Sequence, residues 1–530
     1  MSDLTSLTAV EIASAVAERK LSAAEVTRAF LARIDALNPT INAICTPNPR
    51  ALSEADEIDH RLACGEVARP LEGVPFLVKD NLDTKGVRTT FGSRLMENNV
   101  PGESAICVDR LAAAGGVLLG KTNTPEFAHD VNTSNLLFGT TRNPWDPMVT
   151  AGGSSGGSGA AVAAGFAPLA IGTDLGGSIR IPASFNNLVG IRPAPGRVPF
   201  YPTDYAWDTL VPHLAGPLAG TVADAALMLA VMAGPDDRDP TSLPAADVAF
   251  ADAASGKASI GGRRIALTID FGGIVPVDPE VAAVTRKAAA IFEDLGCTVE
   301  EIALDASDLA EIIAGTRSFG MVARYAERYD EFRDLMTLQL RNQVEAALKM
   351  DVRSIVRAER LRTGYWRRIS RIMARFDYVL TPSCGAPPFR LDEPLPQCVG
   401  GRKVARFYDV FLTTYAFSIT GLPMISLPAG LTRAGLPVGV QLAARRLRED
   451  SAIEAGRAYA AATPGLFRRP TVDVARALPI PPVLPTPGMS CADGDARGTG
   501  TAPIFWTLRE NAGWRQSCHR RYRARRSSTM

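Results

Sequence analysis

The sequence lacks the patterns that mark membrane-spanning, secreted and nucleic-acid-binding proteins. No apolar run reaches the roughly 18 residues of a membrane span. The first residues include acids and show no basic region followed by an apolar run, so no signal peptide is visible. The net charge is only +1 in 530 residues, which gives no sign of a nucleic acid as a partner. We therefore expect a cytoplasmic protein without nucleic-acid or membrane partners.

Cysteine and histidine are also sparse and scattered. The eight cysteines stand singly and form no Cys-x-x-Cys pair, which in so long a chain argues for reduced thiols rather than a disulfide framework. The four histidines show no metal-ligand spacing, either among themselves or with the cysteines. We therefore expect neither a metal nor a cofactor.

The rest of the composition is that of an ordinary globular protein, with 46% hydrophobic and 21% charged residues. Short apolar runs of strand length, such as Gly73–Lys79, alternate with helical patterns, which predicts an α/β protein with a buried sheet. The pattern is mostly helical and charged over 305–376. It then returns to strands at 378–381, 424–427 and 438–442. The sequence therefore predicts that the C-terminal third completes the sheet around a helical excursion.

The organisation of the chain favours one large domain over residues 1–477. No internal repeat is present, and no linker-like stretch divides this part. Residues 478–530 differ, because they are rich first in proline and then in arginine. From Gly488 to Met530 eight arginines face three acids, which gives +5 and leaves −4 for the rest. This tail fits a basic segment for an anionic partner or a disordered end, such as a shifted reading frame would produce, and we favour disorder.

The stretch from Thr150 to Ala183 concentrates glycine and serine in two clusters, 152–159 and 176–178. An apolar segment of small residues, 160–171, joins them. A solvated linker would be polar throughout, so both clusters are expected to lie against a core. Glycine lets the backbone approach a reacting centre closely, and serine supplies a hydroxyl that can attack or relay a proton. The stretch therefore predicts an active site built largely from backbone.

Three interpretations of these clusters compete. A Walker phosphate loop needs lysine where Ser158 stands, and a dinucleotide fingerprint needs glycine where Val162 stands, so both fail. Gly152–Gly156 formally matches the nucleophile elbow of an α/β-hydrolase esterase, but loop-like residues precede it. That mechanism also needs a histidine after the serine. Only two histidines follow the serine in the chain. His213 lies in a segment rich in proline and glycine, where a structural role is favoured, and His519 lies in the tail.

The third interpretation needs no histidine, because a neutral lysine can also activate a serine. The motifs GGSSGGSGAAVAAG and GTDLGGSIRIPA resemble both halves of the motif of the amidase signature family, and GVPFLVKDN resembles its lysine segment. LLGKTNTPEF and TTRNPWDP are similar to family segments between them. Lys79 precedes Ser154 by 75 residues and Ser178 follows Ser154 by 24, which also fits the family. The resemblance covers roughly residues 5–475.

The resemblance implies a single large α/β domain in which helices cover both faces of a twisted mixed β-sheet. It also implies a Ser–cis-Ser–Lys triad with Ser178 as nucleophile, Ser154 on a cis peptide bond as bridging serine, and Lys79 as general base. A lysine that works near pH 7–8 needs its pKa lowered by about 3 units, which burial can supply. The oxyanion would be bound by the backbone N–H groups of Leu175, Gly176, Gly177 and Ser178.

Residues beside the triad are expected to support it. Ser155 is the rival of Ser154 as bridging serine, and only the family register selects Ser154 and leaves Ser155 structural. Asp174 and Arg180 flank the nucleophile loop as a structural pair, and Thr173 is expected to help orient that loop.

The resemblance implies an amidase that hydrolyses a carboxylic, primary amide to the carboxylate and ammonia through a seryl acyl-enzyme. Ala128 and His129 align with family positions that line the acyl side, although an ordinary surface histidine fits His129 equally well. The alternatives are the amidase subunit of a tRNA-dependent amidotransferase, an α/β-hydrolase esterase and a non-catalytic scaffold. The amidase subunit would need partner subunits, and its Arg-containing helical motif is not clear here. The acyl chain, its chirality and the oligomeric state, a homodimer included, stay open.

Overall fold

A mixed sheet of eleven strands runs through the centre of the computed structural model. The described residues are 3–203, 205–208, 213–245, 250–255, 259–393, 395–404 and 406–472. The expected tail at 478–530, with His519, lies outside them. In spatial order the strands are β1 (Ile44–Pro47), β3 (Val117–Thr122), β2 (Pro75–Lys79), β6 (Leu169–Asp174), β8 (Leu214–Ala219), β7 (Val189–Arg192), β14 (Met424–Leu431), β15 (Pro437–Ala444), β11 (Tyr378–Pro382), β9 (Arg264–Leu267) and β10 (Thr298–Glu301).

The pairing of the strands confirms the predicted α/β class and the late completion of the sheet. β2 runs parallel to both β3 and β6, whereas β6, β8 and β7 pair in antiparallel fashion. The C-terminal β14 pairs with β7 and β15, and β15 pairs with β11. Every residue of β2 and β6 is buried, which explains why both strands begin with a continuous apolar run in the sequence. Two further hairpins are β4 (Ser134–Asn135) with β5 (Gly139–Thr140), and β12 (Cys398–Val399) with β13 (Arg402–Lys403).

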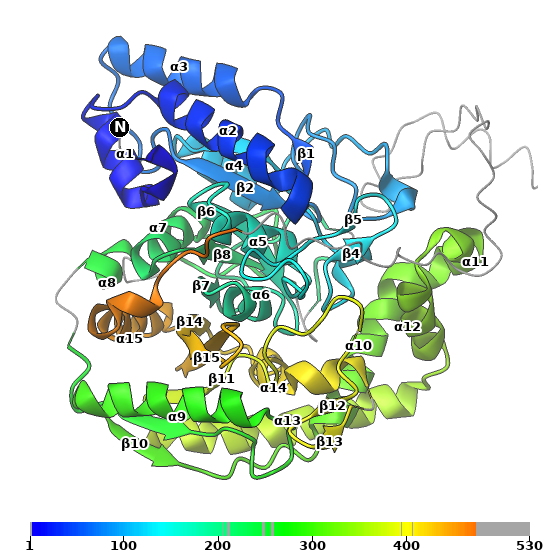
Figure 1. Ribbon diagram of the computed structural model, residues 1–530. Helices are drawn as coiled ribbons and strands as arrows, with labels where there is room; N and C mark the ends of the chain where they lie inside the picture. The colour runs from blue at the N-terminus through cyan, green and yellow to red at the C-terminus, as the bar shows by residue number, and fades with distance from the viewer. Residues whose placement is uncertain are drawn as a thin grey trace, which may run out of the picture.

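Helices cover both faces of the sheet, as predicted. Figure 1 shows the central strands between α7 and α15 on one side and α5 and α6 on the other. The α-helices are α1 (Ala9–Ala17), α2 (Ala23–Ile41), α3 (Ala51–Ala63), α4 (Ile106–Ala113), α5 (Gly156–Ala163), α6 (Arg180–Phe185), α7 (Val222–Met232), α8 (Phe250–Ser255), α9 (Pro279–Asp294), α10 (Leu309–Tyr325), α11 (Tyr329–Phe332), α12 (Leu338–Leu348), α13 (Val352–Arg375), α14 (Leu412–Ser418) and α15 (Glu449–Ala462). Short 3₁₀ turns lie at η1 (Leu4–Ser6), η2 (Arg94–Met96), η3 (Glu126–Ala128), η4 (Ala326–Arg328), η5 (Arg333–Leu335), η6 (Phe407–Phe411) and η7 (Pro464–Leu466).

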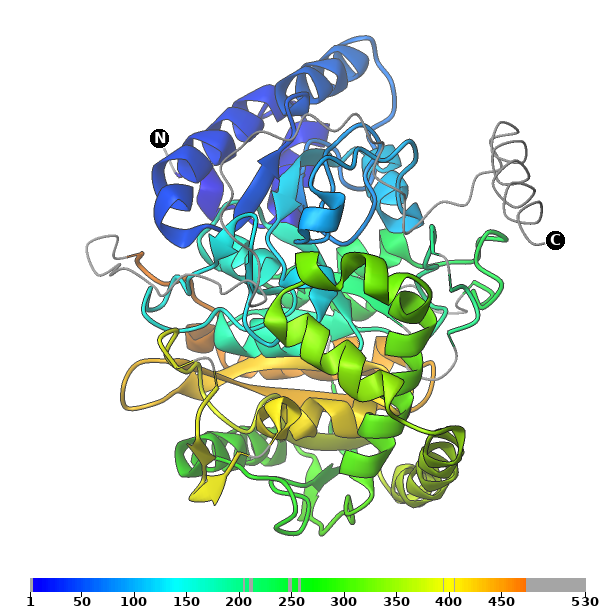
Figure 2. The same cartoon turned by 90° about the vertical axis from the view of Figure 1, so that its right-hand side faces the viewer.

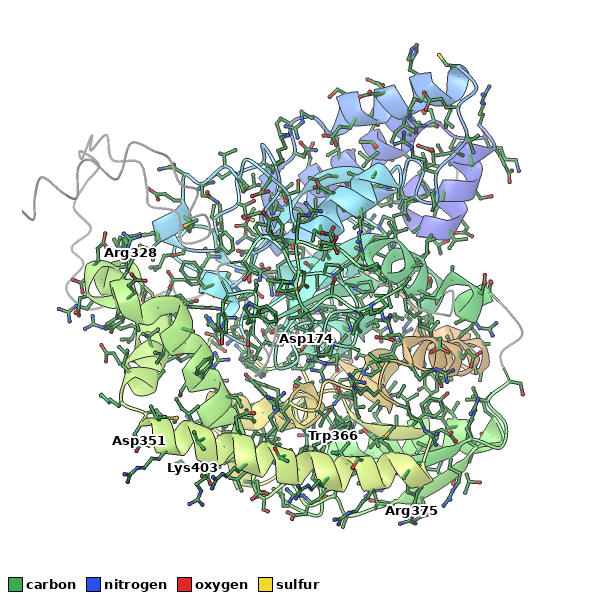
Figure 3. All side chains as sticks on the ribbon, turned by 180° about the vertical axis from the view of Figure 1, so that it is seen from behind. Asp174, Arg328, Asp351, Trp366, Arg375 and Lys403 are labelled. Carbon is green, nitrogen blue, oxygen red and sulfur yellow. The ribbon has the colours of Figure 1, made fainter. Side chains whose placement is uncertain are left out.

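The helical excursion predicted over 305–376 consists mainly of α10 to α13. Figure 2 shows the bright green helices α10 and α12 in front of the middle of the molecule. Met321 and Tyr325 of α10 share a hydrophobic cluster with Phe91 and Phe127 from the N-terminal half. Helix α13 runs along the outside, between the labels Asp351 and Arg375 in Figure 3. The excursion therefore packs against the segments that follow β2 and β3.

Candidate active site

Lys79 ends strand β2, which lies between β3 and β6 in the interior of the sheet. Its side chain is buried, and its Nζ donates hydrogen bonds to Ser154 Oγ at 2.7 Å and to Thr173 Oγ1 at 2.9 Å. Burial lowers the pKa of Lys79 well below its ordinary value of 10.5, against a smaller raising effect of the Asp174 charge. The amine is therefore shifted toward its neutral form, in which it can accept a proton.

Ser154 lies in the loop that precedes α5 and is joined to Gly153 by a cis peptide bond. The hydroxyl of Thr124 donates to the Ser154 carbonyl at 3.1 Å, which holds this loop beside the end of β3. A Cβ at position 153 would lie 2.6 Å from the carbonyl oxygen of Val131, so only glycine fits there. The loop thus places the Ser154 hydroxyl against the lysine.

Ser155, the rival bridging residue, makes different contacts. Its Oγ donates to the carbonyl oxygen of Thr173 at 3.1 Å and accepts from the Thr173 N–H at 3.1 Å. Ser154 lines a cavity together with Ser178, whereas Ser155 is buried outside that lining. The geometry therefore separates the two neighbours, because Ser154 contacts Lys79 and Ser155 ties the loop to β6.

Ser178 lies between β6 and α6 and faces the same chamber as Ser154, a cavity of about 30 Å³. Its carbonyl oxygen accepts a hydrogen bond from the Ser155 N–H at 3.1 Å, which joins the two glycine- and serine-rich clusters. The residue is half-buried, and within the described part of the chain its Oγ has no hydrogen-bond partner. The hydroxyl is therefore open to a molecule in the chamber.

The backbone before Ser178 passes close under helix α14, which explains its two glycines. A Cβ at Gly176 would lie 2.3 Å from the ring of Tyr415, and a Cβ at Gly177 would lie 2.3 Å from Thr414 Oγ1. The N–H of Gly177 donates to Asp174 Oδ1 at 2.8 Å and is already occupied. Of the expected oxyanion donors, the N–H groups left without an acceptor among the described residues are those of Leu175, Gly176 and Ser178.

A buried ion cluster fixes the shape of this loop, and Figure 3 shows Asp174 deep inside the molecule. Arg180 contacts both carboxylate oxygens of Asp174, each at 3.0 Å, and Arg192 Nε lies 3.4 Å from Oδ1. All three side chains are fully buried. Burial alone would raise the pKa of Asp174, but the charges of the two arginines hold it at about 2. The expected pair of Asp174 and Arg180 is therefore part of a cluster of three charged side chains that includes Arg192.

Replacing Arg180 with methionine is expected to lower the free energy of unfolding by about 3–5 kcal/mol, because Asp174 then keeps a buried charge with one partner fewer. The Asp174 contribution is complete above about pH 4 and is lost as the pH falls toward 2, because its folded pKa lies below its unfolded pKa. Urea denaturation measures both effects. The exposed Arg353→Met change on α13 serves as control and should stay within about 0.5 kcal/mol. A loss below about 1 kcal/mol for Arg180→Met would contradict a structural role for the cluster.

Ala128 and His129, the residues predicted to line the substrate site, both border the chamber that contains Ser178. His129 is buried rather than on the surface, and both of its ring nitrogens are occupied. Nδ1 lies 3.3 Å from Arg317 Nη2, and Nε2 lies 3.0 Å from the hydroxyl of Tyr325. Burial, with the charge of Arg317, lowers the pKa of His129 well below 6.5. The residue therefore forms a neutral, fixed part of the wall.

A second and larger cavity of about 230 Å³ adjoins the chamber, and the two share the side chains of His129 and His213 in their linings. The wall of the larger cavity includes the aromatic side chains of Phe91, Phe127, Phe200, Tyr201, Tyr205 and Tyr325, together with charged side chains such as those of Asp83, Asp239 and Arg362. The sequence context of His213 favours a structural role, but the structure places this residue at the junction of the cavities. An elongated molecule could therefore reach Ser178 with one end and occupy the larger cavity with the other.

Sequence reasoning missed several neighbours of the site. Arg192 is the last residue of the otherwise apolar strand β7, and a charge at such a strand end was an available signal. Asn81, which donates to Thr173 Oγ1 at 3.0 Å, lies inside the lysine motif. Arg317 and Tyr415, which hydrogen-bond each other at 3.0 Å, carry no local signal because they come from α10 and α14. Within the described residues no group of three or more His, Cys, Asp or Glu could hold a metal, and no helix is long and apolar enough to cross a membrane.

Comparison with known proteins places this geometry in context. The profile of the family described as Amidase matches residues 25–453. An acylamidase of Rhodococcus erythropolis is 36% identical over 481 residues, covering 88% of this chain and 97% of that protein. A glutamyl-tRNA(Gln) amidotransferase subunit of Synechococcus sp. (strain CC9605) is also 36% identical over 481 residues, covering 85% and 95%.

Solved structures show the same likeness. A bacterial aryl acylamidase of the amidase signature enzymes superposes with a TM-score of 0.82 and 30% identity, covering 89% of this chain and 99% of that chain. The 6-aminohexanoate cyclic dimer hydrolase in complex with its substrate has a TM-score of 0.77 and 30% identity over the same shares. The likeness therefore extends over 89% of this chain in both cases.

Proposed function

Because the chain belongs to the amidase signature family, we propose that it hydrolyses a primary carboxylic amide to the carboxylate and ammonia through a seryl acyl-enzyme. One observation carries the proposal. Nζ of the buried Lys79 lies 2.7 Å from Ser154 Oγ, and Ser154 lines the same chamber as Ser178. A lysine kept neutral by its surroundings can activate a serine without histidine. Membership makes the chain an amidase, and the substrate and the residue roles are our proposal.

In the first half of the reaction, Ser178 Oγ attacks the amide carbonyl carbon. The Ser178 proton passes to Ser154 while the Ser154 proton passes to the lone pair of neutral Lys79 across their 2.7 Å contact. The carbonyl oxygen gains a negative charge, which the free backbone N–H groups of the loop stabilise. Removing one such donor typically costs about 3 kcal/mol of transition-state stabilisation. When the C–N bond breaks, the lysine proton returns through Ser154 to the leaving nitrogen, and ammonia departs.

In the second half, a water molecule attacks the ester carbonyl of the acylated Ser178. Lys79 again receives a proton through Ser154 and then returns it to Ser178 Oγ as the ester bond breaks. The carboxylate leaves and the free serine is restored. The same proton path thus serves both steps, with each group acting first as base and then as acid.

We expect the isolated chain to release ammonia from small aliphatic and aryl primary amides. The expectation follows because no partner is needed to complete the contact between Lys79 and Ser154. The measurement is hydrolysis of a panel of primary amides, N-alkyl amides and carboxylic esters by equal amounts of folded protein, followed as release of ammonia, of the alkylamine and of the alcohol, respectively. Hydrolysis confined to esters, or to N-alkyl amides, would contradict the proposed substrate class.

A second candidate is supported by the likeness to the glutamyl-tRNA(Gln) amidotransferase subunits, which is as high in identity as the likeness to the acylamidase. If this chain has that function, we expect the isolated chain to hydrolyse none of the amides in the panel. It also predicts ammonia release from glutamine once the other subunits of such an amidotransferase are added. The two functions therefore give opposite results in the first experiment.

A further inference from the structure

One histidine nitrogen has no hydrogen-bond partner among the described residues where the two cavities meet. His129 and His213 line both cavities, but both ring nitrogens of His129 have partners, Arg317 and Tyr325. His213 Nδ1 lies 3.3 Å from Arg324 Nη2. Its Nε2 has no hydrogen-bond partner in the described part of the chain, and the side chain is only half-buried. This nitrogen therefore faces space that a bound molecule could fill.

The contact with Arg324 determines which nitrogen of His213 carries the proton. A guanidinium group only donates hydrogen bonds, so His213 Nδ1 must accept, and a neutral ring then carries its proton on Nε2. Arg324 itself is fixed, because its Nη2 lies 2.6 Å from Asp208 Oδ2 and its guanidinium lies over the ring of Tyr205. Burial, with the Arg324 charge, lowers the pKa of His213 well below 6.5, which keeps the ring neutral. The fold therefore presents the Nε2–H of His213 as a hydrogen-bond donor at the junction.

We propose that His213 is a substrate-binding residue whose Nε2–H donates a hydrogen bond to an oxygen atom in the acyl group of the amide. The inference rests on the proposed function and deepens it by naming a substrate class. That class is a primary amide whose acyl chain carries an ether, carbonyl or hydroxyl oxygen near the scissile carbonyl and ends in an apolar group. The oxygen meets His213 at the junction while the scissile carbonyl lies at Ser178.

The larger cavity fits the apolar end of such a molecule. Its volume is about 230 Å³, and its wall includes the aromatic side chains of Phe91, Phe127 and Tyr325. An apolar cavity of roughly 150 Å³ holds benzene, so a phenyl group fits. An N–H donor in a mainly apolar wall gains most from a ligand that supplies an acceptor, because burying the donor unpaired costs free energy. The junction therefore favours substrates with an oxygen atom at one position along the acyl chain.

The test uses three primary amides of equal length, which are 4-phenylbutanamide and the two ethers 3-phenoxypropanamide and 2-(benzyloxy)acetamide. Affinities are measured by calorimetry on Ser178→Ala protein, and kcat/KM is measured on protein with Ser178 intact. We expect one ether to be preferred over the hydrocarbon about 3- to 10-fold. The preference should fall to about 1 in His213→Leu and return to at least about 3 in His213→Gln, which keeps a donor. The exposed His60→Leu serves as matched control and should keep the preference.

Each outcome separates this inference from the proposed function. Equal hydrolysis of all three amides, or an ether preference that survives in His213→Leu, overturns the role of His213 and leaves the amidase proposal intact. An ether preference in binding without any ammonia release supports the role of His213 and contradicts the proposed function. Failure of the Ser178→Ala protein to bind any of the amides overturns the inference. Nitrogen-15 NMR of the imidazole at pH 7 should show a proton on Nε2 alone, and a doubly protonated ring would also overturn it.

Discussion

Ser178→Ala is expected to lower kcat for primary amides by about 10⁴- to 10⁶-fold, because removal of a catalytic nucleophile leaves only binding and the oxyanion donors. The side chain is half-buried and makes no described hydrogen bond, so the change should leave the fold intact. KM should change little, since the hydroxyl reacts with the substrate rather than holding it. The measurement is ammonia release at saturating amide, with urea denaturation to compare stability.

Variants of two other serines serve as comparisons for Ser178→Ala. Ser154→Ala is expected to lower kcat by about 10²- to 10⁴-fold, the range for loss of a proton-transfer group. Ser53→Ala, an exposed change on α3, should keep kcat within about twofold and serves as matched control. A Ser178→Ala protein with more than about a hundredth of the normal kcat would contradict its role as nucleophile.

Lys79→Met is expected to lower kcat by about 10²- to 10⁴-fold, because no other base contacts Ser154 in the described site. Methionine has a similar length and needs no hydrogen-bond partner, so the buried position tolerates it. Lys79→Arg should be at least as inactive, since a guanidinium stays protonated and cannot accept the serine proton. Activity of Lys79→Arg close to that of the unaltered protein would contradict general-base catalysis by this residue.

The pH dependence gives an independent check on Lys79. Its folded pKa lies well below 10.5, and the reaction needs the neutral amine, so kcat/KM should rise with pH through a pKa below 10.5. Between the folded pKa and the unfolded pKa the unfolded chain binds one more proton, so the contribution of Lys79 to stability also rises with pH there. Both effects should disappear in Lys79→Met. A rising limb that persists in the variant would belong to another group.

The sequence predicted most of the architecture because the core elements are short and strongly apolar. The α/β class, the helical excursion over 305–376 and the C-terminal completion of the sheet are all confirmed. The apolar segment 160–171 was recognised in the sequence, but the strand at its end was not. Strand β6 begins at Leu169 and continues through Thr173 and Asp174. A short buried strand among small residues has no periodicity that separates it from a helix or loop.

Motifs predicted the close neighbours of the site, but not contacts that depend on the order of the strands. The lysine and serine motifs predict that Lys79 and Ser154 act together, and the structure brings them into contact. Asp174 ends β6 and Arg192 ends β7, and these two strands are the neighbours of β8 on its two sides. The contact between the two side chains therefore depends on this strand order. The loop-like sequence around His213 gives no sign of its place between the cavities, which depends on Arg324 of α10. Such contacts join residues more than a hundred positions apart or across the sheet, where local patterns carry no information.

The central claim is that Ser178 carries the acyl group during hydrolysis. The most direct measurement is mass spectrometry of peptides from protein that is quenched in acid during turnover of a slowly hydrolysed aryl amide or its activated ester. We predict an added mass equal to the acyl group on the peptide that contains Ser178, absent in Ser178→Ala and retained in Ser155→Ala. Acylation of Ser154 or Ser155 instead, or ammonia release from Ser178→Ala at the normal rate, would contradict the account.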